Sequence, residues 1–271
     1  MRNLAQPTFD DHAALDKLRQ SRSNDAKAVT PRISDIGTRY NQYVAVQGNP
    51  WQLAADASFQ PIRKELVGLY SRPPTALPHI PVLRAGIEGA CPVCGRDSLG
   101  TLDHYLPKAQ YSEYAFFSKN LVPACYRCNN ARSNLVCGPN DGERPIHPYF
   151  DVFAARRLMT IHAEPDWRAP ALTSVPFEVE GVELVVVQWH IENVIRPAGI
   201  DAYVRHLWGC LVINPVLYLG KVATRDAVKH SLIAQMMIEE KSGNSPNAWR
   251  SCFYHGLAHN VDALDYLVTI I

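Results

Sequence analysis

The 271-residue sequence has no hydrophobic stretch long enough to cross a membrane and no apolar leader at its start. Its apolar runs, such as 185–187, fall far short of the roughly 18 residues that a spanning helix needs. The first residues, MRNLAQP, lack the hydrophobic core of a secretion signal. We therefore expect a cytoplasmic protein without a membrane partner.

The sequence has little net charge, and its hydrophobic content is not low. Charged residues make up 20% of the chain and hydrophobic residues 47%, and the formal net charge is +1. Disordered chains combine high charge with few apolar residues, so this composition indicates a globular protein. The length suits one large domain or two modest ones.

Seven cysteines are an odd number, and four of them form two Cys-x-x-Cys pairs, Cys91/Cys94 and Cys125/Cys128. In a chain without an export signal, this spacing favours metal ligation over disulfides. Two such pairs complete a closed tetrahedral Zn²⁺ shell. We expect this zinc to be structural, because four thiolate ligands leave no open coordination position. The other cysteines lack partners at this spacing and are expected in the core: Cys137, Cys210 and Cys252.

An insert of 30 residues, from Gly95 to Ala124, separates the two pairs, so they do not form a plain zinc ribbon. It contains Asp103 and His104, which suit phosphodiester hydrolysis. A neutral imidazole with a pKa near ~6.5 is a natural base at cellular pH. A carboxylate is the hard oxygen ligand that a magnesium-like ion prefers. Consecutive strand residues point to opposite faces, so both side chains serve one site only if the strand ends or bends there.

The order of these motifs resembles the zinc-stapled HNH endonucleases, also called ββα-metal or His-Me finger nucleases. The matching pattern is C-x-x-C, then D-H-x-x-P, then N-L-V-P-x-C-x-x-C-N, within residues 91–134. The resemblance implies a central ββα finger with a structural zinc. It also implies metal-dependent hydrolysis of DNA with Mg²⁺ or Mn²⁺ as the catalytic ion.

The resemblance assigns roles to individual residues. His104 is the general base, and Asp103 and Asn129 are ligands of the catalytic ion. Asn120 is the middle asparagine, which holds the loop and orients the histidine. Asn130 competes with Asn129 for the metal, but the position of Asn129 directly after Cys128 favours it.

Basic residues of the finger are candidates for contacts with DNA phosphates. Phosphate contacts carry no sequence information, so we expect cleavage with little base preference. The candidates are Arg132, Arg127, Lys108 and Lys119.

A second interpretation is a zinc finger that binds nucleic acid or a protein and cuts nothing. A pure binding finger has no need of Asp103, His104, Asn120 and Asn129 together, which favours the enzyme. The wording TLDHYLPK…NLVPACYRCN and the later HPYFD, residues 147–151, also resemble HNH subunits of bacterial anti-phage defence systems, of the Septu and retron-associated types. That resemblance implies a defence effector with an ATPase subunit as partner.

The expected fold class is α+β and mostly helical. Residues 1–83 are expected to form a helical or extended region, with residues 1–30 as a loose arm or a partner-binding segment. Residues 84–150 form the finger, and residues 151–271 form a β-hairpin followed by helices.

Periodicity and capping residues place several further elements. Residues 177–191 are β-prone, with a turn at Glu180-Gly181. Trp249, Phe253 and Leu257 share one face of a late helix, which either packs inside the chain or receives the ATPase subunit. Helices are expected over 33–43, over 61–70 and after Pro197, with Thr224 and Asn260 as N-caps.

Overall fold

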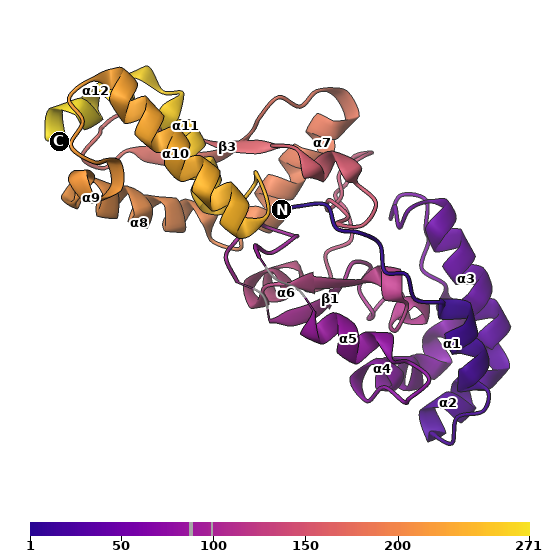
Figure 1. Cartoon of the computed structure of the whole chain (residues 1–271). Coiled ribbons are helices and arrows are strands. Elements are labelled where there is room, and N and C mark those ends of the chain that lie inside the picture. Colours follow the sequence, from indigo (N-terminus) through magenta and orange to yellow (C-terminus); the bar gives the residue numbers. More distant parts are fainter. Residues whose placement is uncertain (87–88, 99) are drawn as a thin grey trace. The chain divides into compact units, whose positions relative to one another are not determined.

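The fold is α+β and about half helical, with two small antiparallel sheets (Figure 1). This computed structural model describes residues 1–86, 89–98 and 100–271. The chain forms two compact units, which we call the N-terminal unit (Asn3–Glu88 and Leu99–Val152) and the C-terminal unit (Met1–Arg2, Gly89–Ser98 and Phe153–Ile271). None of the helices that the structure describes combines the length and hydropathy of a bilayer-spanning segment.

The first thirty residues contain two helices, so the expectation of a loose arm there is wrong. They are α1 (Asp11–Leu18) and α2 (Asn24–Val29). The Asp10 side chain caps α1 by accepting a hydrogen bond of 2.8 Å from the amide of Ala13. Leu15 and Leu18 form part of the buried face of α1. Helices this short contain too few turns to give a clear periodic pattern of apolar residues in the sequence.

Two helices expected in this region are confirmed. They are α3 (Ile33–Ala45) and α4 (Arg63–Ser71), and α4 begins two residues after Pro61 because that proline lies in a preceding 3₁₀ segment. A short helix, α5 (His79–Ala85), follows. The 3₁₀ segments of the chain are η1 (Thr30–Arg32), η2 (Ala57–Ile62), η3 (Ser112–Tyr114), η4 (Ser118–Asn120) and η5 (Val152–Ala155).

A strand–strand–helix segment lies at the centre of the N-terminal unit. Strands β1 (Thr101–His104) and β2 (Leu121–Ala124) pair antiparallel, with His104 opposite Leu121. Helix α6 (Tyr126–Arg132) follows β2 directly and packs against β1. Strand β1 ends at His104, which meets the condition that the sequence set for Asp103 and His104 to serve one site.

Aromatic side chains fill the core of the N-terminal unit. The rings of Tyr40 and Phe117 stack at 4.1 Å between centroids, and Tyr43 meets Phe117 edge-on at 5.2 Å. These contacts place α3 against the long connection between β1 and β2. The connection is therefore held by packing on the N-terminal helices as well as by its own hydrogen bonds.

The C-terminal unit has its hairpin earlier in the chain than expected. Strands β3 (Met159–Glu164) and β4 (Ala171–Pro176) form it, whereas residues 181–190 are the helix α7 (Gly181–His190), so the β prediction for 177–191 is wrong. A continuous apolar run fits a buried helix as well as a strand. The remaining helices are the π-helical turn η6 (Ile191–Ile195), α8 (Ile200–Ile213), α9 (Pro215–Leu219), α10 (Arg225–Gly243), α11 (Trp249–Ala258) and α12 (Val261–Ile270).

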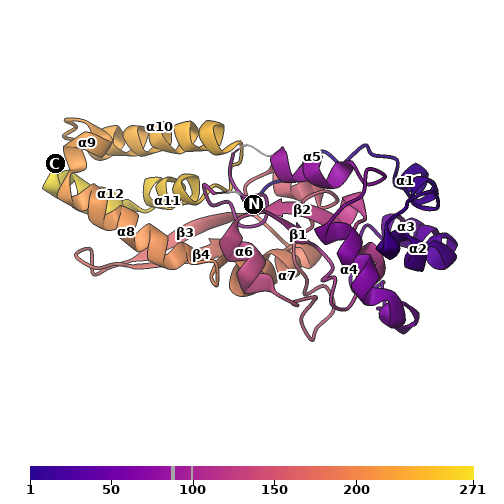
Figure 2. The ribbon, with the colours of Figure 1, turned by 90° about the horizontal axis from the view of Figure 1, so that it is seen from below.

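Helix α11 is the central helix of the C-terminal unit and packs against both α10 and β3 (Figure 2). Trp249, Phe253 and Leu257 are all buried in this unit, so that face packs inside the chain. The predicted caps are confirmed, because the side chains of Thr224 and Asn260 accept hydrogen bonds from the first turns of α10 and α12.

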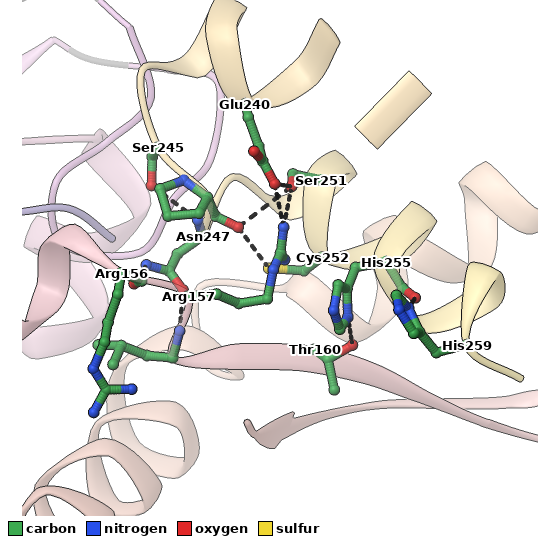
Figure 3. Close-up of polar contacts among 12 residues, drawn as sticks. Arg156, Arg157, Thr160, Glu240, Ser245, Asn247, Ser251, Cys252, His255 and His259 are labelled. Atoms are coloured by element: carbon green, nitrogen blue, oxygen red, sulfur yellow. Dashed lines mark hydrogen bonds and ion pairs between the residues drawn. The ribbon is translucent and has the colours of Figure 1, made fainter. Parts of the chain in front are cut away.

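A polar network joins β3 and the residues just before it to α10 and α11 (Figure 3). Arg157 forms an ion pair with Glu240 of α10 and donates a hydrogen bond of 2.8 Å to Ser251 of α11. Nearby, Thr160 of β3 and His255 of α11 are hydrogen-bonded at 2.8 Å. Burial above all, and then the positive charge of Arg157, lower the pKa of His255 to about 4.

We predict that His255 makes the protein less stable as the pH falls. Its pKa of about 4 in the folded state lies below the ~6.5 of an unfolded chain, so between these values the unfolded state binds more protons and unfolding becomes easier. Urea unfolding of wild type and His255→Gln between about pH 7 and pH 4 tests this. As the pH falls, the free energy of unfolding should decrease more in wild type than in His255→Gln. The variant His162→Gln, at an exposed position, should follow wild type. A difference that is independent of pH would contradict the prediction.

Candidate functional site

The four predicted zinc ligands form a buried cluster. One sulfur from each of Cys91, Cys94, Cys125 and Cys128 lies within 4.8 Å of all the others. A tetrahedral zinc with Zn–S bonds of about 2.3 Å holds its sulfurs about 3.8 Å apart, so a small contraction suffices to bind the ion. The cluster can therefore hold a structural metal such as zinc.

The turn that presents Cys91 and Cys94 is fixed by the C-terminal unit. The Trp249 indole donates a hydrogen bond of 2.6 Å to the Cys94 carbonyl, and the His190 imidazole donates one of 2.7 Å to the Val93 carbonyl. Gly95 has φ +88°, and a Cβ at this position would lie 2.0 Å from the carbonyl oxygen of Asn247. A glycine is thus required both for the backbone conformation and for the close approach.

Asp103, His104 and Asn129 line one cleft in the N-terminal unit. Its volume is about 170 Å³, and its walls come from β1, from the loop after it, from α6 and from α4. Three of the residues singled out in the sequence therefore meet at one place. The full lining is Arg63, Val67, Asp103, His104, Pro107, Lys108, Ala109, Asn129, Ser133 and Asn134.

The imidazole of His104 is held in one tautomer. Its Nε2–H donates a hydrogen bond of 2.9 Å to the carbonyl of Ala115, so Nδ1 carries the lone pair. Burial above all, and then the positive charge of Lys108, lower the pKa of His104 to about 3. The side chain is therefore neutral at cellular pH and has a nitrogen that can accept a proton.

Asp103 is the acidic member of the cleft, and its carboxylate is oriented by two neighbours. Oδ1 accepts a hydrogen bond of 2.7 Å from the amide of His104, and Oδ2 accepts one of 3.0 Å from Arg132. The Arg132 side chain is only 3% exposed and also donates to the carbonyl of Tyr105. Its charge thus faces Asp103, and the phosphate contact predicted for it stays a prediction.

Asn129 lies on α6 and lines the cleft, whereas Asn130 is exposed and does not. The assignment of Asn129 rather than Asn130 as a metal ligand stays a prediction. The other predicted basic residues differ in position. Lys108 lines the cleft, but Arg127 is exposed on α6 outside the lining, and Lys119 lies 3.9 Å from Asp11.

Asn120 is fully buried and its side-chain amide makes four hydrogen bonds. Nδ2 donates to the carbonyls of Leu106 and Tyr114, each at 3.1 Å. Oδ1 accepts from the amide of Leu106 at 2.7 Å and from the hydroxyl of Tyr43 at 3.2 Å. The amide therefore clamps the two ends of the loop that carries the acceptor of His104.

The sequence analysis missed Tyr43, Tyr70 and Arg63, and it named His147 only as part of the segment 147–151. His147 accepts the amide of Tyr149 on Nδ1, so its Nε2–H donates to Tyr43 at 3.0 Å, and Tyr43 in turn donates to Asn120. Tyr70 of α4 lies edge-on to the His104 ring at 4.4 Å. Tyr43, Tyr70 and Arg63 lie at least 30 residues before Asp103, where no spacing rule connects them to it.

Comparison with known proteins gives one local similarity. No protein-family profile and no solved structure matches the chain. Protein ea31 of Escherichia phage lambda is 39% identical over 62 residues, which are 22% of this chain and 21% of that protein. The chain therefore spans about a fifth of the length of this relative.

We predict that zinc binds at the cysteine cluster and is needed for stability, because binding a structural metal contributes directly to the free energy of folding. Elemental analysis of the purified protein should find about one zinc per chain. Cys94→Ser should lose the metal and unfold at lower temperature, whereas Cys210→Ser, outside the cluster, should keep both properties. Folded wild-type protein without zinc would contradict the assignment.

We predict that Asn120→Ala destabilises the protein by about 3 kcal/mol. The substitution leaves buried carbonyls and a buried amide without partners, and each such loss costs about 1–3 kcal/mol. Asn130→Ala, at an exposed position of α6, is the matched control and should change stability by less than about 0.5 kcal/mol. Chemical denaturation measures both, and equal effects would show that the Asn120 bonds do not hold the loop.

Proposed function

We propose that the protein is a metal-dependent endonuclease that hydrolyses phosphodiester bonds of DNA. The observation that carries this proposal is the cleft in which a neutral His104, with Nδ1 as its lone-pair nitrogen, lies beside Asp103 and Asn129. The β1–β2–α6 order around it fits the ββα finger that the motif resembles.

The donor set of the cleft suits a hard divalent cation. Asp103 offers a carboxylate oxygen and Asn129 an amide oxygen, and both residues line the same cleft. Oxygen donors of this kind are the protein ligands of Mg²⁺ and Mn²⁺. Such an ion, when bound, stabilises the negative charge that develops on the phosphate and on the leaving 3′ oxygen.

His104 acts in this proposal as the general base. Its Nδ1 accepts the proton of the attacking water, and the Ala115 carbonyl stabilises the imidazolium that forms, because it accepts a hydrogen bond from Nε2–H. The low pKa of the imidazole in the protein alone favours the neutral base. An anionic phosphate in the cleft raises this pKa, because a nearby negative charge favours the imidazolium.

The biological setting is part of the same proposal. The resemblance to defence-associated HNH subunits suggests that the substrate is invading DNA and that an ATPase subunit is the partner. The alternative is a zinc-stapled module that binds DNA or protein without cutting. Wild-type protein that binds DNA but leaves it intact with both Mg²⁺ and Mn²⁺ would favour the alternative.

We predict that His104→Ala lowers the rate of plasmid nicking by about 10²–10⁴-fold, because a positioned general base contributes that factor. Nicking is measured with Mg²⁺ and with Mn²⁺, with and without the product of the neighbouring gene. His162→Ala, which removes an exposed histidine of the C-terminal unit, is the control and should nick as wild type does. His104→Asn serves as a second variant if alanine impairs folding, which circular dichroism and zinc content report. Undiminished nicking by folded His104 variants would refute the assignment.

A further inference from the structure

We infer that helix α4, which lies outside the motif-bearing segment, supplies a DNA phosphate-binding residue of the cleft, Arg63. This inference rests on the proposed function for its substrate class. It assigns to Arg63 a contact with a backbone phosphate next to the scissile bond. Arg132, one of the arginines predicted for phosphate binding, is buried against Asp103, whereas Arg63 is exposed.

Arg63 has the position and the freedom that such a contact requires. It is the first residue of α4 and lines the cleft together with His104 and Asn129. Its side chain is exposed, and within the described ranges it has neither a hydrogen bond nor an ion pair. A guanidinium with all its donors available matches a phosphate, which accepts two parallel hydrogen bonds.

The charges around the cleft favour an anion. Among the residues that line it, Asp103 carries the negative charge, and the buried Arg132 balances this charge at 3.0 Å. Arg63 and Lys108 then leave an excess of positive charge. Lys108 lies over the ring of Tyr70 at 5.7 Å, which keeps its ammonium at the rim without neutralising it.

Helix α4 is fixed to the strand that carries the catalytic pair. The Tyr70 hydroxyl donates a hydrogen bond of 2.8 Å to the carbonyl of Leu102 in β1, and its ring packs on His104. Leu66 and Leu69 anchor the buried face of the helix. The backbone of Arg63 is therefore held at a set position relative to His104, as a residue that aligns the substrate must be.

The salt dependence of DNA binding tests the inference. Full-length protein carrying His104→Ala, for which strongly reduced nicking is expected, is titrated against a fluorescein-labelled DNA duplex between about 50 and 200 mM salt. Adding Arg63→Ala should reduce the slope of log K against log salt by about 0.9, the value for one phosphate contact. The matched control is Lys64→Ala, because Lys64 is next in sequence, exposed and outside the cleft lining. Its slope should lie closer to that of the His104→Ala protein than the slope of Arg63→Ala does. Arg63→Lys should retain the slope.

The outcomes separate this inference from the proposed function. An unchanged slope in Arg63→Ala, or an equal loss in Lys64→Ala, overturns the inference even when the wild type cleaves DNA. A reduced slope specific to Arg63→Ala supports it. If the wild type binds DNA and never cleaves it, the nuclease proposal fails, while a specific loss of slope still identifies Arg63 as a phosphate contact.

Discussion

The side-chain amide of Asn120 fixes the geometry on which the candidate site depends. By holding the carbonyl of Tyr114, it sets the position of the next carbonyl, that of Ala115, which accepts a hydrogen bond from Nε2–H of His104. A backbone carbonyl can only accept, so this contact selects the tautomer with the lone pair on Nδ1. One buried amide thus influences both the shape of the loop and the tautomer of His104. Tyr43 extends the same chain of hydrogen bonds to α3.

The electrostatics of the cleft depend on a second buried contact, the ion pair of Asp103 and Arg132. Removing one partner of such a pair leaves an uncompensated buried charge, which is strongly unfavourable. Each residue is therefore a structural requirement of the other. The positive charge of Arg132 is balanced by Asp103. The positive charges of Arg63 and Lys108, which line the cleft, remain available for an anion.

The parts of the site that the sequence predicted are those encoded by local spacing. Two Cys-x-x-Cys pairs, and Asp103 next to His104, are recognisable because few residues separate the groups that act together. Arg63 and Tyr70 come from a helix more than 30 residues earlier, and only folding brings them to His104. The strand prediction for residues 177–191 was wrong for another reason. Its apolar run has no distinct period, so packing in the C-terminal unit decides that it becomes a helix.

The dependence of the site on distant helices follows from the size of its central element. Strands of four residues and a helix of seven bury too little apolar surface to hold a catalytic geometry unaided. The aromatic rings of α3 pack on the β1–β2 connection, and Tyr70 of α4 packs on His104 itself. The N-terminal helices thus form one wall of the cleft as well as part of its support. A polypeptide restricted to residues 91–134 would keep every motif residue and the Ala115 acceptor. It would lose the packing of Tyr70 on His104 and of α3 on the β1–β2 connection.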